Sequence, residues 1–379
     1  MIIGVPKEIK GNEYRVALTP SGAAALRRGG HTVLIESKAG SGSGFSNGDY
    51  EAGGATILDQ PVEIFKRADL IMKVKEPQFQ EYLLLRPGHI LFTFLHLLPE
   101  PTLTRTLLEK KITSIAYETV GHGNILPLLA PMSVVAGRMA VQIGAQYLSL
   151  PCGEKGVLLG GVPGVEAAQV VIIGGGTVGT NAARIAIGLG ARVAVLDIST
   201  LRLQQIDDLF AGRVTTIIST QHTLSEWTAK ADLLIGAIML PGIKAPKLIT
   251  KSMVMSMAPG SVIVDVAIDQ GGCVETIEHV STQDNPFYRK YGVLHYAVSN
   301  MAGVVPRTST IALTNATLPY VLQLAAFGWK EACLRDDKLA AGLNTVAGHV
   351  TCKALADAHQ LPYYPWRDIL AEALDKPAD

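Results

Sequence analysis

The 379-residue sequence has no net charge, because 33 lysines and arginines balance 33 aspartates and glutamates. No block of basic residues interrupts this balance, so the sequence gives no reason to expect a nucleic-acid partner. Only 17% of the residues are charged, whereas 48% are hydrophobic. This composition is typical of a well-buried globular protein and leaves room for a sizeable interface between subunits.

Cysteine is also scarce. The four cysteines are widely spaced and form no C-x-x-C pair, which favours separate thiols of a reducing compartment over a disulfide or zinc framework. The histidines are scattered and no pair has metal-ligand spacing, so we predict no metal site. The cysteines are Cys152, Cys273, Cys333 and Cys352.

Long apolar segments are absent as well. The longest apolar runs, such as residues 90–98, are far shorter than the ~18 residues that a membrane-spanning helix needs, and this run contains His96. Met1 leads directly into the strand-like sequence IIGVP, which leaves no room for a signal peptide. We therefore expect a cytoplasmic protein with no membrane partner.

The most informative stretch lies between Gln169 and Asp197. A β-branched run, residues 170–173, breaks into three glycines, after which apolar residues recur at helical spacing from 178 to 189. A second apolar run then ends on Asp197, about 20 residues beyond the first glycine. Strand, glycine turn, helix, strand and terminal acid together predict a dinucleotide-binding βαβ unit, although any α/β protein can contain a glycine-rich turn.

Each glycine of this turn has a physical task. Gly174 forms the turn, Gly176 lets the backbone approach a pyrophosphate, and Gly179 lets the helix pack closely on its strand. Backbone N–H groups and the positive end of the helix dipole would hold the phosphates. Asp197 can accept hydrogen bonds from ribose hydroxyls and would repel a 2′-phosphate, so NAD is favoured over NADP. Arg202 lies near enough to weaken this preference slightly.

The chain length predicts two domains. Strands alternate with helices over the first ~130 residues and again around the nucleotide unit, which predicts parallel, doubly wound sheets. Beyond residue 306 the strand signals cease, and helices at 311–327, 350–358 and 369–374 fit best on the first domain. The strands are predicted at residues 2–5, 31–35, 55–58, 69–75, 89–95, 112–117, 170–173, 193–196, 214–218, 233–235, 262–266 and 293–296.

We therefore predict an α/β protein with two doubly wound parallel-sheet (Rossmann-like) domains. An NAD-binding domain at 131–306 would be inserted into a discontinuous substrate domain at 1–130 and 307–379. Two helices, at 132–150 and 308–327, are expected to cross between the two halves.

The carboxyl ends of the predicted strands select candidate site residues, because ligands bind there in open α/β sheets. Arg15 follows the first strand, and Lys75 and His96 close two apolar segments of the same domain. In the second domain the segment SVIVDVAID ends on Asp269, which we expect to face the other three across a cleft.

A dehydrogenase for a small amino or hydroxy acid needs these residue types. Arg15 can donate two parallel N–H groups to a carboxylate, and Lys75 can donate from a single ammonium group. A histidine is suited to proton transfer near neutral pH. Each residue also has a structural alternative. Lys75 could be an ordinary solvated lysine, and only the earlier position of Lys73 in the strand disfavours Lys73 as the functional lysine. His96 could be a hydrogen-bonded core histidine, and Asp269 could be a helix N-cap.

Along its whole length the sequence resembles the alanine dehydrogenases of the alanine dehydrogenase/pyridine nucleotide transhydrogenase family. Residues 274–292 match that family poorly, and we assign nothing there. The stretches that carry the resemblance are GVPKEIKGNEYRVALTP (4–20), KVKEP (73–77), FTFLHL (92–97), SIAYETV (114–120), LPLLAPMSVVAGR (126–138), SVIVDVAIDQGG (261–272) and VSNMAGVVPRTSTIALTNATLPY (298–320).

The resemblance implies NAD-dependent oxidative deamination of L-alanine to pyruvate and ammonia, the reverse reductive amination, and a homohexamer. It implies that Arg15 and Lys75 bind the substrate carboxylate and that His96 and Asp269 are the acid/base pair. The implied cofactor contacts are Ser133, Gly174, Gly176, Thr177, Val178, Gly179, Asp197, Arg202, Ser219, Ile238, Met239, Val266, Ala267, Ile268, Val298, Asn300 and Met301.

Three other functions remain open at this point. The chain could be the NAD-binding subunit of a proton-translocating transhydrogenase, an NAD-responsive protein without catalysis, or a dehydrogenase for another small amino or 2-hydroxy acid. The coexistence of Arg15, Lys75, His96 and Asp269 argues against the first two.

Overall fold

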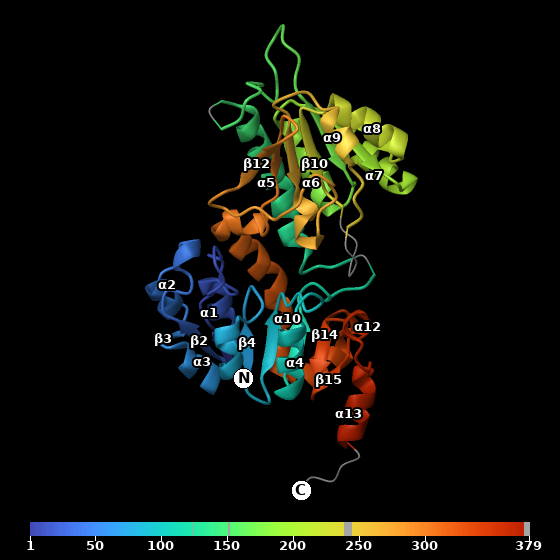
Figure 1. The fold of residues 1–379 in the computed structure, drawn as a ribbon. Helices are drawn as coiled ribbons and strands as arrows, with labels where there is room; N and C mark the ends of the chain where they lie inside the picture. The colour runs from blue at the N-terminus through green and yellow to red at the C-terminus, as the bar shows by residue number, and fades with distance from the viewer. Residues whose placement is uncertain (124, 151, 239–244, 375–379) are drawn as a thin grey trace. The chain divides into compact units, whose positions relative to one another are not determined.

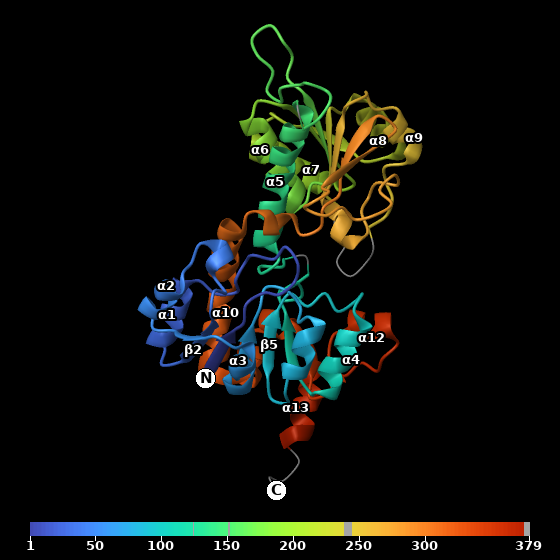
Figure 2. The ribbon, with the colours of Figure 1, turned by 60° about the vertical axis from the view of Figure 1, so that its left-hand side comes forward.

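The computed structural model describes residues 1–123, 125–150, 152–238 and 245–374, without the side chains of 269–270 and 372–374 (Figures 1 and 2). The chain forms two compact units. The first combines Met1–Met132 with Val305–Asp379, and the second is Ser133–Val304. In Figure 1 the first unit therefore contains both ends of the colour scale.

The described part of the first unit contains an eight-stranded sheet. Its order is β15-β14-β6-β5-β4-β1-β2-β3. The six strands from the N-terminal segment are parallel to one another, whereas β14 and β15 add an antiparallel edge. The strands are β1 (Ile2–Val5), β2 (Thr32–Glu36), β3 (Thr56–Leu58), β4 (Leu70–Met72), β5 (Ile90–Thr93), β6 (Thr113–Ala116), β14 (Leu343–Val346) and β15 (His349–Val350).

The prediction that no strand follows residue 306 is therefore wrong. β14 has the sequence LNTV, four residues with two polar side chains, which is too short and too polar to be detected as an apolar run. Its polar side chains find partners only in the folded sheet. Thr345 Oγ1 lies 2.7 Å from Ser114 Oγ and donates to the carbonyl of Ile112 at 2.9 Å.

The helices of the first unit largely follow the predicted signals. The helix α1 begins at the cap Thr19, whose side chain accepts from Gly22 N, with Pro20 in the first turn. The helices are α1 (Pro20–Arg28), α2 (Asn47–Ala52), α3 (Pro61–Arg67), α4 (Pro101–Glu109), α10 (Pro306–Arg335), α11 (Asp337–Ala340), α12 (Lys353–His359) and α13 (Trp366–Leu374), with 3-10 turns η1 (Ser41–Ser43) and η2 (Phe79–Leu84).

The long helix α10 corrects one expectation. We expected a helix at 308–327 to cross between the two halves, but α10 belongs wholly to the first unit. Gly328, with φ 69°, interrupts its helical geometry directly after Phe327, the predicted end of the helix, and α10 continues beyond it to Arg335. Among the described helices α10 alone is long and apolar enough to span a membrane, a test that the core helix of a soluble protein also passes.

The described part of the second unit contains a seven-stranded sheet in the order β12-β13-β11-β10-β7-β8-β9. All of its neighbours pair in parallel except β12, which pairs antiparallel with β13 and lies in the segment left unassigned above. The strands are β7 (Gln169–Ile173), β8 (Arg192–Asp197), β9 (Thr215–Ile218), β10 (Leu233–Gly236), β11 (Val262–Asp265), β12 (Phe287–Lys290) and β13 (Val293–Tyr296).

Helices cover both faces of this second sheet, because β7 sends alternate side chains to two separate cores. Val170 and Ile172 pack with α5 and α6, whereas Val171 and Ile173 pack with α8 and α9. The helices are α5 (Ala130–Leu148), whose first turn lies in the first unit, α6 (Thr177–Gly188), α7 (Thr200–Phe210), α8 (Gln221–Lys230) and α9 (Lys251–Met255), with 3-10 turns η3 (Val266–Gln270) and η4 (Met301–Val304).

Two parallel-dominated, doubly wound sheets thus confirm the predicted fold class, with antiparallel strands at their edges as the correction. Both sheets reverse strand order next to their first strand, at β1/β4 and at β7/β10. Such reversal points are where open α/β sheets bind ligands. All four cysteines are free thiols, as the sequence predicted.

Candidate active site

Three predicted site residues of the first unit follow adjacent parallel strands. The strands β5, β4 and β1 are neighbours in the sheet, so their carboxyl ends lie at one edge. Arg15 lies in the segment after β1, Lys75 after β4 and His96 after β5. The sheet topology therefore brings the segments of all three residues to the same edge.

These strands end earlier than predicted, at Met72 in β4 and Thr93 in β5, so Lys75 and His96 lie in the segments that follow. The physical reason is that carboxylates accept the next backbone N–H groups. Glu8 Oε1 accepts from the N–H groups of Val74 at 2.6 Å and Lys75 at 3.4 Å. A side chain thus ends the strand pairing.

Arg15 is buried, with 2% of its surface exposed. Its guanidinium group forms a bidentate ion pair with Glu13, through Nε to Oε1 at 2.7 Å and Nη2 to Oε2 at 2.6 Å. Nη1 lies 3.0 Å from the sulfur of Met132. This pairing fixes the orientation of the guanidinium group within the chain.

The side chains of Lys73 and Lys75 lie in different environments. Lys73 is fully buried, and its Nζ lies 3.1 Å from Glu8 Oε2 and 2.9 Å from Glu81 Oε1. Burial alone would lower the pKa of Lys73, but the two carboxylates raise it above its usual value. Burial also raises the pKa of Glu8, against the attraction of Lys73. Lys73 is therefore part of a buried ion-pair network, whereas Lys75 is only half-buried.

His96 is exposed, so the alternative of a core histidine is wrong. Its imidazole stacks on the ring of Phe94, with centroids 5.9 Å apart and planes 9° apart. Its backbone has φ 46°, in the left-handed region that non-glycine residues seldom adopt. Such backbone geometry concentrates at functional sites.

The glycine turn of the second unit matches the tasks expected of it. Gly174 has φ 100°. A Cβ at Gly179 would lie 1.9 Å from the carbonyl oxygen of Gly174, so α6 can pack here only without a side chain. At Gly176 a Cβ would meet no described atom within 4 Å, so it would project into open space beside the turn. These residues fit the close approach of a pyrophosphate to the N-terminus of α6.

Asp197 and Arg202 both hold this turn. Asp197 Oδ2 accepts from Gly175 N at 2.7 Å. Arg202 donates from Nε to the carbonyl of Gly175 and from Nη2 to Thr180 Oγ1 at 2.6 Å, and its Nη1 bonds Gln205 at 2.9 Å. All three guanidinium nitrogens therefore have partners within the chain. Arg202 braces the turn, whereas Asp197 retains lone pairs for further donors.

Other predicted cofactor residues adjoin the turn. Ser219 donates its backbone N–H to the carbonyl of Asp197 at 2.9 Å. Ile238 lies two residues after the end of β10, and its Cγ1 would lie 3.4 Å from a Cβ at Gly174. In α5, Gly137 packs so closely on Val178 that a Cβ would lie 2.2 Å from the Val178 carbonyl oxygen. Ser133 lies one helical turn earlier on the same face of α5.

The segment after β11 also differs from the prediction. The strand ends at Asp265, one residue before the predicted end at Val266, and Asp265 caps the turn η3 by accepting from Ala267 N at 3.1 Å. The predicted cofactor contacts Val266, Ala267 and Ile268 and the predicted acid/base residue Asp269 all lie in η3. Asp265 is fully buried, and burial raises its pKa.

The remaining predicted contacts follow β13. Val298 and Met301 are buried, and Asn300 has φ 59°. Met239 and the side chain of Asp269 lie outside the described residues. No group of three or more His, Cys, Asp or Glu side chains suited to a metal ion occurs in the described part of the chain.

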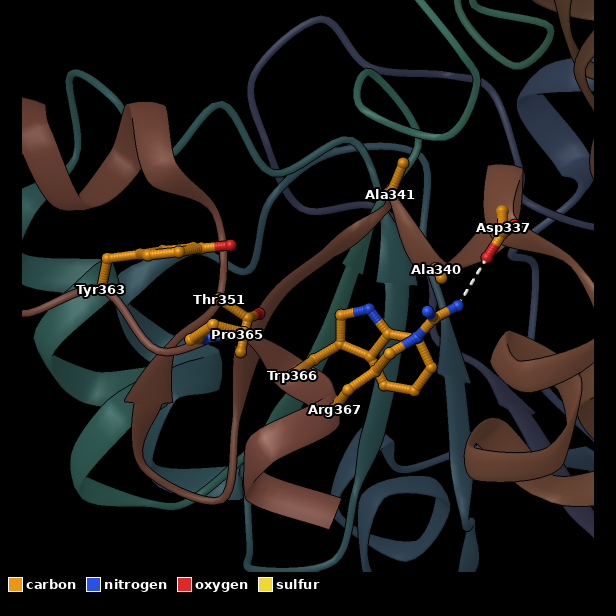
Figure 3. Close-up of a pocket in the computed structure, with 8 residues that line it drawn as sticks. All are labelled: Asp337, Ala340, Ala341, Thr351, Tyr363, Pro365, Trp366 and Arg367. Atoms are coloured by element: carbon orange, nitrogen blue, oxygen red, sulfur yellow. Dashed lines mark hydrogen bonds and ion pairs between the residues drawn. The ribbon is translucent and has the colours of Figure 1, made fainter. Parts of the chain in front are cut away.

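A surface pocket of about 420 Å³ lies elsewhere in the first unit (Figure 3). Arg367 pairs with Asp337 at 2.9 Å and lies over the ring of Trp366. No predicted site residue lines this pocket. The lining residues are Asp337, Ala340, Ala341, Thr351, Tyr363, Pro365, Trp366 and Arg367.

Sequence reasoning missed the carboxylates that hold the strand-end segments, namely Glu8, Glu13 and Glu118. Glu118 accepts from the backbone of Leu95 and His96. The available signal was an acid close to a strand end, but an acid there is usually solvated. Their partners are either local or tens of residues away, so spacing alone does not identify them.

Comparison with known proteins shows which family the chain resembles. The models for the N-terminal and C-terminal domains of alanine dehydrogenase/PNT match residues 4–136 and 140–353. An alanine dehydrogenase of Methanococcus maripaludis is 58% identical over 98% of this chain and 100% of its own length.

Solved structures agree with this assignment. An L-alanine dehydrogenase structure superimposes with a TM-score of 0.92 at 49% identity, covering 95% of this chain and 99% of the other. A transhydrogenase from Sinorhizobium meliloti gives a TM-score of 0.81 at 25% identity, covering 93% of this chain and 100% of the other. Fold, glycine turn and matched domains lead to one assignment: the chain belongs to the alanine dehydrogenase/PNT family.

Proposed function

We propose that the protein is an NAD-dependent alanine dehydrogenase that converts L-alanine to pyruvate and ammonia and catalyses the reverse reductive amination. The observation that carries this proposal is the set of adjacent strand ends bearing Arg15, Lys75 and His96, in a chain 58% identical to an alanine dehydrogenase.

The first unit would hold the substrate. Arg15 and Lys75 are both cationic, and together they would bind the alanine carboxylate and fix its orientation. The Glu13 pair holds the guanidinium group in place before substrate arrives.

The second unit would hold the cofactor. Gly174, Gly176 and Gly179 shape the turn for the pyrophosphate, and the N–H groups at the start of α6 would bind its oxygens. Asp197 would accept from ribose hydroxyls, which favours NAD. NAD, when bound, accepts a hydride from the substrate.

His96 is the proposed proton carrier. The substrate amine must be deprotonated before hydride leaves Cα, and the resulting imine must take up water and release ammonia. An exposed imidazole can accept and return these protons. Asp269, in η3, is proposed as its acid/base partner on the basis of the family resemblance.

A direct assay tests the reaction. Purified protein is mixed with NAD and L-alanine at alkaline pH and NADH absorbance is followed, with lactate, serine and glycine as control substrates. We expect NADH from L-alanine. Faster turnover of another substrate would contradict the specificity, and NAD binding without turnover of any small substrate would favour the transhydrogenase-subunit alternative.

We also propose a cytoplasmic homo-oligomer, a hexamer by resemblance. Residues 156–167 form an arm that extends beyond the sheet of the second unit, seen as the green hairpin in Figures 1 and 2. Leu158, Val162 and Val165 on this arm are 66%, 53% and 64% exposed. Apolar groups gathered on an arm of this kind suit contact with a second copy of the chain.

Light scattering tests self-association. The wild type should have a mass several times that of one chain, and Val162→Asp with Val165→Asp should reduce it because a charge would be buried at the contact. A monomeric wild type would contradict the oligomer, and an unchanged mass in the double variant would exclude the arm from the interface.

A further inference from the structure

We propose that Glu118 is a positioning residue for His96, so that part of the rate of the reaction depends on a carboxylate that does not itself touch the substrate. This inference rests on the proposed function, because it assigns to Glu118 the placement of the proton carrier. It follows from contacts within the first unit alone.

Glu118 holds the backbone directly at the histidine. Its Oε1 accepts from the N–H of His96 at 2.6 Å, and both of its oxygens lie within reach of the N–H of Leu95, at 3.1 and 3.2 Å. A carboxylate that accepts consecutive N–H groups makes charge-assisted hydrogen bonds, which are shorter and stronger than neutral ones. The backbone entering His96 is thus fixed by one side chain.

The backbone of His96 needs such a partner. Its φ of 46° places it in the left-handed region, which is unfavourable for a residue with a Cβ unless the surroundings hold it there. The position also ends the pairing of β5, since the N–H groups of Leu95 and His96 turn to Glu118. Without the carboxylate, nothing described would offset the unfavourable backbone conformation of His96, and the N–H groups of Leu95 and His96 would lose their acceptor.

This backbone position determines where the imidazole lies. His96 is exposed, and its ring stacks on that of Phe94. Phe94 is itself buried against Tyr117, with centroids 5.1 Å apart and planes 81° apart. Glu118 and Phe94 therefore fix the backbone and the ring of His96 respectively. Small misplacements of a catalytic group can lower rates strongly.

The first test is Glu118→Ala, with Glu118→Gln as the conservative variant. We expect Glu118→Ala to lower kcat about tenfold to 100-fold, with KM for L-alanine and the Kd of NAD changed by less than about twofold. Glu118→Gln keeps one oxygen for the His96 N–H and should restore most of kcat. Glu100→Ala removes an exposed carboxylate in the segment 96–100 and should leave kcat unchanged.

A double-mutant cycle separates positioning from general stability. If Glu118 acts through His96, then Glu118→Ala should cause no further loss of kcat in the His96→Ala background. Equal losses in both backgrounds would overturn the proposal, as would wild-type kcat in the Glu118→Ala single variant. If Glu118→Ala does not fold, the same cycle is run with Glu118→Asp, whose shorter side chain withdraws the carboxylate from the His96 N–H, and it is judged by the same two outcomes. Failure of the wild type to oxidise L-alanine would instead overturn the proposed function.

Discussion

The two units shape the carboxyl edges of their sheets by different means. In the first unit, side-chain carboxylates hold the segments, with Glu8 bonded to the backbone after β4 and Glu118 to the backbone after β5. In the second unit the backbone itself forms the site, with Gly174 and Gly179 packed at distances that exclude a Cβ. One edge depends on charge and the other on the absence of side chains.

This difference suits the ligand proposed for each edge. A pyrophosphate is long and can be held by backbone N–H groups, so glycine spacing is sufficient. A small amino acid offers only a carboxylate, an amine and a methyl group, so fixed side chains must supply recognition and proton transfer. The two edges should therefore respond to mutation in different ways.

The largest effect should come from Gly179→Ala. Its Cβ would lie 1.9 Å from the Gly174 carbonyl oxygen, which forces α6 away from its strand and should cost about 3 kcal/mol of stability and weaken NAD binding about 100-fold or more. Calorimetric NAD titration and thermal melts measure both. The matched control is Gly188→Ala in the same helix, where the added Cβ would meet no neighbouring atom within 4 Å. A slight stabilisation is expected there. Equal behaviour of the two variants would contradict the backbone account.

Next in size is His96→Ala, which tests the side-chain edge. Loss of the proton carrier should lower kcat about 10²-fold or more, while the Kd of NAD stays unchanged because the glycine turn belongs to the other unit. Steady-state kinetics and NAD titration measure the two quantities separately. Unchanged turnover would remove His96 from the mechanism, and weakened NAD binding would contradict the separation of the two edges.

The third prediction concerns His89, which directly precedes β5, the strand that His96 follows. His89 is fully buried, its Nε2 donates to the Phe65 carbonyl at 2.8 Å, and burial lowers its pKa to about 4. Since the unfolded state then binds the proton more readily, this contribution to stability is present above pH ~6.5 and is lost as the pH falls toward 4. The loss should be about 2 to 3 kcal/mol.

Chemical denaturation at several pH values measures this effect. The unfolding free energy of His89→Gln should be lower than that of the wild type at pH 7 but should depend less on pH between 7 and 4. Parallel pH profiles for the two proteins would show that His89 does not titrate as described. The comparison shows how two histidines flanking one strand differ, one buried and structural, the other exposed.

The smallest effect should come from Asp197→Ala. Loss of acceptors for the ribose hydroxyls should weaken NAD binding about tenfold, equivalent to about 1.4 kcal/mol, and reduce discrimination against NADP. The effect is limited because Arg202 also holds the turn through Gly175 and Thr180. Competitive titration with both cofactors measures it, and an unaltered preference for NAD over NADP would contradict the role of Asp197.

Most of the fold could be predicted from the sequence, and the failures have physical causes. The β7 strand, the α6 helix and Asp197 were recognised because a local pattern specifies them. The strand β14 was missed because its polar side chains bond residues distant in sequence, Thr345 to Ser114 and Ile112 and Asn344 to Thr119. The predicted ends of β4, β5 and β11 lie too far along the chain, because a carboxylate accepts the backbone N–H groups that follow each strand. For β4 and β5 this carboxylate is distant in sequence, and for β11 it is the last residue of the strand.

The sequence by itself determined the alternation of strands and helices, the glycine turn and the residue types available for chemistry, because each depends on neighbours within one element. Only the tertiary structure distinguished the surroundings of Lys73 from those of Lys75, since Lys73 is fully buried in an ion-pair network and Lys75 is half-buried. It likewise showed that His96 is exposed with a left-handed backbone bonded to Glu118. Burial and ion pairing arise between segments that meet only when the chain folds, so local sequence patterns cannot predict them.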